Sequence, residues 1–272
     1  MLSNLLALVA AASDLVRLVF VAAAPTNSSS KIFTSSQAVS TLASATNPGP
    51  VPVITNAASI AASISTQPSQ VDRLKQLLTL NGTLLTGDAL RELTVFDFSN
   101  TANVTEGGAG GTLLLATVDN FPILEITDIS AGVAFIEPCG LNIPHSHPRA
   151  SEVLTVVEGV LNAGFVQENG FATEVDTQLG KYQATVFPMG SIHFQQNPTC
   201  DPAIFVAALN SKDPGRNDIA TNFFMLDPAI VNATLGFPTT IGGSNIEQFR
   251  QHIPANLALG VDTCLKACGL VQ

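Results

Sequence analysis

The chain has 272 residues, of which 46% are apolar and 12% charged, enough for one core of ordinary size with extensions. Its 21 acidic residues against 11 basic ones give a net charge of -10 at pH 7. This balance excludes nucleic acids and anionic membrane surfaces as partners, because both are bound through basic patches. Low charge with many Ser, Thr and Asn residues is typical of a secreted glycoprotein.

Residues 1–24 contain two apolar runs, 5–12 and 15–24, and end in small residues. This pattern predicts a secretory signal peptide, so the mature protein is expected outside the cell or in the cell wall, with no membrane anchor left. The alternative is an N-terminal anchor helix. It would place Asp14 and Arg17 near the middle of the bilayer, where each costs about 2.5 to 3.5 kcal/mol.

Residues 25–90 are predicted to form an N-terminal arm. Up to Gln67 this segment carries one charged residue, Lys31, among Ser, Thr, Ala, Asn and Pro. Such a composition favours an extended chain over a packed one. Ser69 followed by Asp72 is a weak capping box, and leucines at helical spacing come next, which predicts a short helix over about 70–80.

Between residues 91 and 215 the apolar pattern becomes that of strands. Short β-branched or aromatic runs alternate with Gly, Asn, Asp and Pro, which predicts an all-β barrel or jelly roll. The expected strands are 94–98, 112–118, 121–127, 131–137, 153–157, 160–166, 173–177, 184–187 and 203–209. The glycine-rich segment 107–111 runs into a strand and not a helix, so a hairpin tip is favoured over a phosphate loop.

Residues 216–272 are predicted to form a helical C-terminal extension, because the strand pattern fades after residue 215. Helices are expected at 217–225, 228–235 and 244–253, the last ended by Pro254. One of the four histidines, His252, lies in this extension. It is predicted to be a structural or surface residue.

The other three histidines lie in two stretches, PCGLNIPHSHPRASEVLTVVEG and, about forty residues later, FPMGSIHFQQN. In an extended strand His145 and His147 leave the same face, because the side-chain period of a strand is two. A short turn can return Glu152 to the same place, and a turn signal precedes His193. Three imidazoles and a carboxylate without a thiolate suit Mn(II) or Fe(II) better than Zn(II).

The spacing of these residues carries a family resemblance. The pattern HxHxxxxExxxxxxG followed by PxGxxHxxxN resembles the two cupin boxes of germin-like proteins. In this chain it is formed by His145, His147, Glu152, Gly159, Pro188, Gly190, His193 and Asn197. The segments PCGLNIPHSHPRASE and DPAIFVAALNSKDPG resemble the corresponding segments of the fungal and slime-mould branch of this family, which is called spherulin-like. The resemblance covers about 94–215 and implies a cupin β-barrel; Cys139 and Tyr182 stand where the family has turn glycines.

The resemblance also implies a function. Germin-like proteins include manganese enzymes that dismutate superoxide and others that oxidise oxalate. In the latter, two asparagines lie beside the metal. One matches Asn142, a candidate donor to bound substrate, and the other falls on Gly132, which argues against oxalate oxidation here. Germins form homo-oligomers in which C-terminal helices reach over a neighbouring subunit, so oligomers are expected.

Two functions therefore remain open. The first is a secreted, manganese-dependent oxidoreductase acting on superoxide or on a small carboxylate such as oxalate. The second is a non-catalytic protein of a wall, spore or cyst, in which the metal only stabilises the barrel. Metal analysis followed by assays for both activities would separate the two.

Four cysteines, an even number in a chain expected to be secreted, predict disulfides, and three pairings are open. If the two boxes pair antiparallel, as in cupins, the register that brings the histidines together also puts Cys139 opposite Cys200. The predicted bridges are therefore Cys139–Cys200 and Cys264–Cys268. Zinc binding by the last two cysteines is disfavoured, because no second pair lies near them in the sequence.

Glycosylation is predicted at Asn-x-Ser/Thr sequons. Their asparagines are Asn27, Asn81, Asn103 and Asn232. Such sequons also arise by chance, so only a part of them is expected to carry sugar. Asn27, in the predicted arm, is expected to be the easiest to modify.

Overall fold

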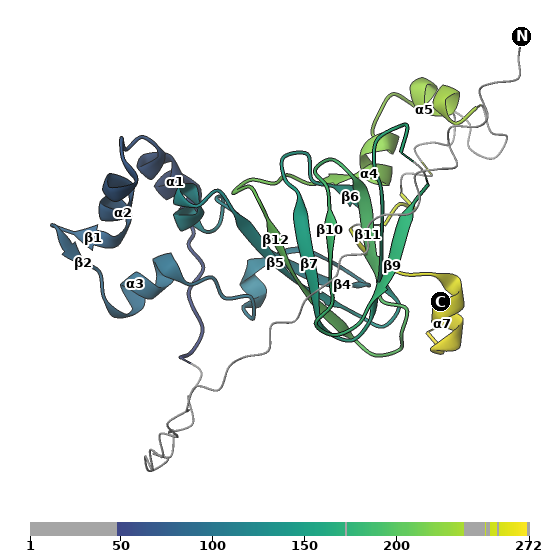
Figure 1. Ribbon diagram of the computed structural model, residues 1–272, viewed down its shortest axis with the longest axis horizontal. Helices are drawn as coiled ribbons and strands as arrows, with labels where there is room; N and C mark the ends of the chain where they lie inside the picture. The colour runs from purple at the N-terminus through teal and green to yellow at the C-terminus, as the bar shows by residue number, and fades with distance from the viewer. Residues whose placement is uncertain (1–47, 172, 237–247, 249–250, 255, 271–272) are drawn as a thin grey trace, which may run out of the picture. The chain divides into compact units, whose positions relative to one another are not determined.

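The computed structural model describes residues 48–171, 173–236, 248, 251–254 and 256–270 (Figure 1). The predicted signal peptide, the sequon at Asn27 and most of the predicted helix 244–253 lie outside these residues. Within the described part of the chain, no helix has the length and apolar character needed to cross a bilayer.

Three short helices precede the barrel in the chain: α1 (Ala57–Ser65), α2 (Gln70–Leu78) and α3 (Gly87–Thr94), with a hairpin of β1 (Thr79–Leu80) and β2 (Thr83–Leu84) after α2. Helix α2 confirms the predicted helix, and the Ser69 side chain caps it by accepting a hydrogen bond from the Asp72 amide at 3.1 Å.

Helix α1 shows that the expectation of an extended arm is wrong for residues 57–65. Its sequence, AASIAASIS, contains few polar groups, and Ala57, Ala61 and Ile64 recur at helical spacing and are buried. That apolar stripe packs against a 3-10 helix, η2 (Pro122–Ile126). The helix is therefore stabilised by tertiary packing, which composition alone does not reveal.

Two predicted strands, 94–98 and 121–127, are also wrong. Thr94 ends helix α3, and residues 95–98 have no regular structure. The Phe96 ring contacts those of Phe98 and Phe121, with centroids 4.8 and 5.6 Å apart. Residues 122–126 form η2, which begins at Pro122, a residue without an amide hydrogen to give to a ladder. Both aromatic runs pack through their rings and not through strand pairing.

Two six-stranded antiparallel sheets form the barrel, in the orders β10-β7-β12-β5-β4-β3 and β13-β6-β11-β8-β9, with β14 also paired to β6. This arrangement confirms the predicted all-β cupin fold, including the hairpin at the glycine-rich segment. The strands are β3 (Val104–Gly108), β4 (Gly111–Ala116), β5 (Ser130–Ile136), β6 (Gly140–Ser146), β7 (Glu152–Glu158), β8 (Leu161–Val166), β9 (Val175–Leu179), β10 (Ala184–Phe187), β11 (Ile192–Gln196), β12 (Ala203–Leu209), β13 (Asn217–Asp218) and β14 (Leu257–Leu259).

The barrel core lies between the two sheets. Alternate residues of the strands point inward, as the period of two requires. Leu154, Val156, Leu161 and Phe205 are among those that are almost fully buried. Cys139 and Tyr182, which replace the family's turn glycines, both have positive φ angles, of 57° and 66°. The chain thus keeps the left-handed backbone at these turns without the residue that adopts it most readily.

The C-terminal part contains α4 (Ile219–Phe224), α5 (Pro228–Thr234), β14 and α7 (Asp262–Ala267). Helices α4 and α5 confirm two of the predicted helices, and they pack together through Phe224 and Val231. Strand β14 was not predicted. It pairs with the start of β6, residues 140–142, and its Leu257 is 1% exposed within the barrel core.

Glycines allow the backbone of β14 to lie against the β3–β4 hairpin. A Cβ atom on Gly110 would lie 1.8 Å from the carbonyl oxygen of Ala258, and one on Gly108 would lie 2.2 Å from that of Leu257. A Cβ atom cannot lie this close to a carbonyl oxygen, so no residue with a side chain fits at either position. The hairpin that joins β3 to β4 is therefore a docking surface for residues 257–258.

We expect Gly110→Ala to destabilise the protein by about 3 kcal/mol, because the added methyl group meets backbone atoms that cannot move independently. Urea unfolding followed by circular dichroism measures the change. Gly180→Ala is the control, because its Cβ would meet only the Gln183 side chain, at 3.5 Å. Equal stability of the two variants would contradict the close approach of β14.

The disulfides differ from the predicted pairs: they join Cys139 to Cys264 and Cys200 to Cys268. A bulge between His193 and Gln195 shifts the register of β11 against β6, so the rule that placed Cys139 opposite Cys200 fails. Strand β14 then leads the chain past Cys139, whose carbonyl accepts a hydrogen bond from the Gly260 amide at 2.5 Å. All four sulfurs gather at this end of the barrel, with those of Cys139 and Cys268 3.6 Å apart.

Candidate metal centre

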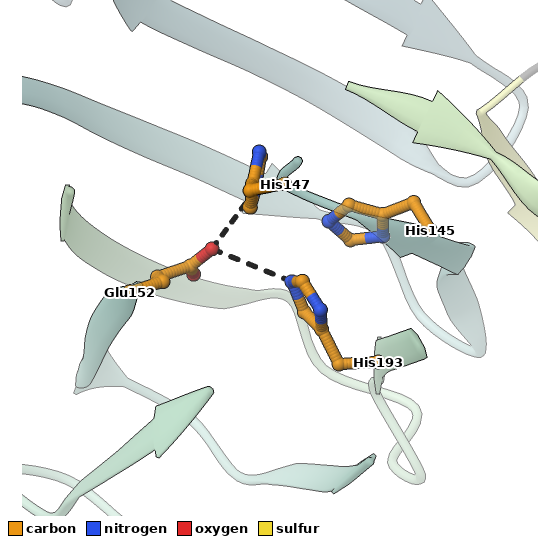
Figure 2. Close-up of side chains that lie close together, drawn as sticks. All are labelled: His145, His147, Glu152 and His193. Carbon is orange, nitrogen blue, oxygen red and sulfur yellow. Dashed lines mark ion pairs between the residues drawn. The ribbon is translucent and has the colours of Figure 1, made fainter. Parts of the chain in front are cut away.

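Four side chains from both sheets converge inside the barrel (Figure 2). His145 lies on β6, His147 directly after it, Glu152 at the start of β7 and His193 on β11. His193 and His145 face each other in the β6–β11 ladder, and their ring centroids are 4.2 Å apart. Each of the four residues offers one ligand atom, and these atoms all lie within 4.8 Å of one another. The convergence predicted from the two boxes is confirmed.

Backbone carbonyls fix the orientation of all three imidazoles. The contacts join Nδ1 of His145 to the Ile143 oxygen (2.8 Å), Nδ1 of His147 to the Gly215 oxygen (2.6 Å) and Nδ1 of His193 to the Ser191 oxygen (3.0 Å). A carbonyl can only accept, so each Nδ1 carries the proton and donates it. Each Nε2 is then left with a lone pair, which is the form that binds a metal.

The carboxylate of Glu152 lies in front of these lone pairs. Its Oε2 is 3.1 Å from Nε2 of His147 and 3.5 Å from Nε2 of His193. Burial by itself raises the pKa of Glu152, but proton donation from Nε2 of His147 and His193, whenever these rings are protonated there, outweighs burial and lowers the pKa to about 2. Burial lowers the pKa of His145 well below its usual value, and the charge of Arg216 adds to this effect. The site therefore combines an anionic carboxylate with a neutral imidazole.

The geometry fits a bound cation. With protons on Nδ1, the two Nε2 atoms and Oε2 are all acceptors, and acceptors at such distances repel one another unless a positive charge lies between them. His193 Nε2 is buried and has no hydrogen-bond partner among the described residues. The four residues are 1 to 6% exposed, so bulk water does not screen this repulsion. Phe187 stacks on the His193 ring, at 4.4 Å between centroids, and holds it in place.

A small cavity adjoins the site. Its volume is about 20 Å³, room for roughly one or two water molecules. Its wall consists of Leu113, Leu115, Gly132, Asn142, His145, His147, Glu152, Phe205, Ala207 and Arg216. The wall is thus apolar apart from three of the four converging residues, His145, His147 and Glu152, and an Asn142–Arg216 pair.

Asn142, the predicted donor to substrate, is buried in this wall and is held from both sides. Its Oδ1 accepts a hydrogen bond from Nη2 of Arg216 at 3.0 Å, and its Nδ2 donates to Oε1 of Gln195 at 2.5 Å. Neither Gln195 nor Arg216 was among the residues predicted for the site. Gln195 could have been found, because it lies two residues after His193 and so shares its face of the strand. Arg216 lies between β12 and β13 in the chain, and no local pattern marks it.

The other singled-out residues lie apart from this site. His252 is exposed. Among the sequons, Asn81 is exposed, whereas Asn103 and Asn232 are half-buried. The Asn103 side chain donates a hydrogen bond to the Asp97 carbonyl at 2.9 Å, so glycosylation there would replace this contact.

Comparisons with known proteins agree with the fold and the site. A family model described as Cupin matches residues 96–246. Spherulin-1A of Physarum polycephalum is 37% identical over 210 residues, covering 77% of this chain and 79% of that protein. Germin-like protein 8-9 of Oryza sativa subsp. japonica is 40% identical over 139 residues, 51% of this chain and 62% of the relative.

The solved structures show the same fold. A structure of oxalate decarboxylase from Bacillus subtilis superposes with a TM-score of 0.50 over 58% of this chain and 40% of that one, at 16% sequence identity. At such identity the likeness concerns the fold alone. The sequence matches extend it to the family: this chain belongs to the cupins, within their germin-like and spherulin-like group.

Proposed function

We propose that His145, His147, Glu152 and His193 bind Mn(II), and that the protein is a secreted oxidoreductase for a small anion, superoxide before others. The observation that carries this proposal is the set of three Nε2 lone pairs directed at one ionised carboxylate in a buried space. A cation resolves the repulsion between these acceptors and completes the site.

The ligand chemistry supports manganese. Three imidazoles and one carboxylate, with no thiolate, suit a six-coordinate Mn(II) or Fe(II) ion that keeps open positions, and Zn(II) less well. Bound manganese would supply one-electron oxidation and reduction at those positions. The protein's own contribution is to orient the three rings, to keep Glu152 ionised and to limit the space for water.

The size of the cavity supports a very small substrate. A volume of about 20 Å³ suits a two-atom anion such as superoxide better than oxalate. The family's second asparagine is replaced by Gly132, which is packed against leucines 113 and 115 and offers oxalate no hydrogen bond. Oxalate therefore ranks second among the substrates.

A non-catalytic role is the second candidate function, and one observation favours it. Glu152 comes from β7 in one sheet, whereas His145 and His193 come from β6 and β11 in the other. A cation bound by all three would link the two sheets and stabilise the barrel without any turnover. A structural protein of a wall, spore or cyst requires only this stabilisation of the barrel by the cation.

Secretion and self-association are part of the proposal. The two disulfides support an oxidising compartment. The outer face of the first sheet exposes Val153, Val186, Val206 and Phe135, and an apolar face of this kind supports a homo-oligomer. We propose that sequon-linked sugars cover other parts of the surface.

We expect the purified, secreted protein to contain about one manganese ion per chain and to inhibit the reduction of a dye by superoxide. Chelation should abolish this activity, and added Mn(II) should restore it. Metal content is measured by mass spectrometry, and release of hydrogen peroxide with oxalate is assayed in parallel. Manganese with neither activity would favour the non-catalytic role, and protein that binds no manganese would refute the metal site.

A further inference from the structure

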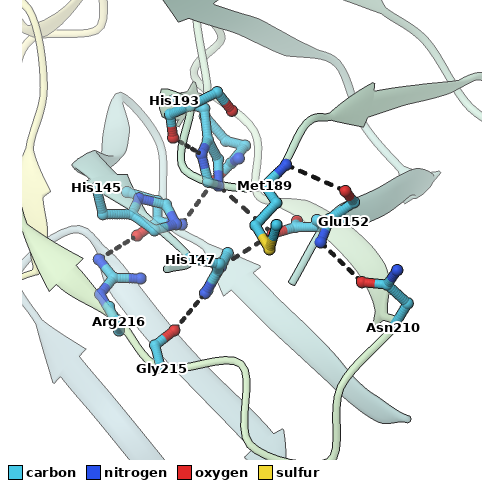
Figure 3. A network of polar contacts seen from close by, with 12 residues as sticks. His145, His147, Glu152, Met189, His193, Asn210, Gly215 and Arg216 are labelled. Carbon is cyan, nitrogen blue, oxygen red and sulfur yellow. Dashed lines mark hydrogen bonds and ion pairs between the residues drawn. The ribbon is translucent and has the colours of Figure 1, made fainter. Parts of the chain in front are cut away.

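Arg216 lies where the loop after the barrel strands meets the metal site. The carbonyl of the preceding residue, Gly215, accepts the proton of His147 Nδ1. The Arg216 side chain is 12% exposed. Figure 3 shows its guanidinium next to the ring of His145. It is the one lysine or arginine among the described residues that line the cavity.

The contacts of Arg216 use one edge of the guanidinium. Its Nε lies 2.7 Å from Oδ1 of Asp218 and 3.1 Å from Oε2 of Glu106, and its Nη2 donates to Oδ1 of Asn142 at 3.0 Å. A guanidinium has five N–H donors. Nη1 makes no hydrogen bond to a described residue, so donors remain for a ligand.

Glu106 and Asp218 determine the position of the Arg216 guanidinium. Two carboxylates on the Nε edge keep the guanidinium in place, although it is largely buried. The three contacts also fix its plane, because Asn142 holds Nη2 on the same edge. An arginine fixed in this way offers a preformed, planar donor edge, which matches the two oxygens of a carboxylate.

We propose that Arg216 binds a small carboxylate, or an oxyanion of the same shape, in the cavity beside His145 and His147. The apolar wall formed by Leu113, Leu115 and Phe205 removes water from such an anion and so strengthens its interaction with the guanidinium. The cavity limits the ligand to a few atoms, as in formate. This inference rests on the proposed function, because it assigns the anion of that same site to a named residue.

Titration of the protein with formate by calorimetry tests the inference. The titration is done on metal-free and on zinc-loaded protein, so that neither manganese nor turnover is needed. We expect Arg216→Gln to weaken formate binding by about 10- to 100-fold, the usual effect of losing a charged hydrogen bond. Arg216→Lys should lie between Arg216→Gln and wild type, because it keeps the charge but loses the planar fork. The control is Arg149→Gln, an exposed arginine paired with Asp213 at 2.5 Å outside the cavity.

Glu106→Gln separates ligand binding from a purely structural role. It perturbs the same buried pair as Arg216→Gln but keeps the donors of Nη1, so it should weaken formate binding less than Arg216→Gln does. If Arg216→Gln does not fold, the double variant Glu106→Gln/Arg216→Gln removes the buried pair together and is titrated instead. Equal formate affinity with and without Arg216, or no formate binding to wild type at millimolar concentrations, would overturn the inference.

The outcomes also distinguish this inference from the proposed function. Arg216-dependent formate binding without superoxide or oxalate activity would contradict the oxidoreductase and leave the anion site standing. Manganese-dependent activity in a protein that does not bind formate would contradict only the role of Arg216.

Discussion

Glu152→Gln is expected to lower the affinity for Mn(II) by at least about 100-fold. This loss exceeds the usual effect on metal affinity of mutating a residue that only hydrogen-bonds to a metal ligand. The substitution keeps the shape of the side chain and removes its charge. His147 and His193 would then face a neutral amide, which does not balance a divalent cation. Because a ligand that binds only the folded state stabilises it in proportion to the logarithm of its affinity, the variant also loses about 2.7 kcal/mol of metal-dependent stability.

Competition with a chelator measures the affinity, and thermal unfolding with and without Mn(II) measures the stabilisation. Glu158→Gln is the matched control, because Glu158 lies at the other end of the same strand and is exposed. We expect this control to bind Mn(II) as wild type does. Retention of wild-type affinity by Glu152→Gln would show that the carboxylate is not a ligand.

Removal of the Cys139–Cys264 bridge is expected to destabilise the protein by about 5 kcal/mol. The two cysteines are 125 residues apart, and the chain-entropy model assigns about this value to a loop of such length. The Cys200–Cys268 bridge, with a separation of 68, should contribute about 4 kcal/mol. Both bridges attach α7 to the barrel, so loss of either one also loosens β14 from β6.

The variants replace both cysteines of a bridge by serine, Cys139→Ser with Cys264→Ser or Cys200→Ser with Cys268→Ser. Single replacements are unsuitable, because the sulfurs of Cys139 and Cys268 lie 3.6 Å apart and a freed thiol could exchange with the remaining bridge. Chemical unfolding measures the stability, and peptide mapping without reduction identifies the pairs. A peptide linking Cys139 to Cys200 would contradict the observed pairing and restore the one predicted from the sequence.

The metal ligands could be predicted because their signals are local. His145 and His147 share a strand face, and a turn returns Glu152 to them within a few residues. His193 was added by the spacing of the second box, and the β6–β11 ladder confirms it. These relations depend on strand period and turn chemistry, which a sequence shows directly.

The features that sequence analysis missed all depend on distant contacts. The bulge at His193 and Gln195 changes a register that arithmetic on residue numbers takes as constant. Arg216 donates a hydrogen bond to Asn142, which lies 74 residues earlier in the chain. Helix α1 is stabilised by packing on η2, and the aromatic run that begins at Phe121 is not a strand because Pro122 cannot join a ladder. Such contacts leave no periodic pattern in the sequence.

The pairing of β14 with β6 has a consequence for synthesis of the protein. Leu257 reaches its place opposite Asn142 only after more than a hundred further residues have left the ribosome. Until then the start of the strand that carries His145, residues 140–142, lacks one of its neighbours. The pairing that covers Asn142, in the wall of the cavity beside the ligands, is thus completed only after all four ligands have been synthesised.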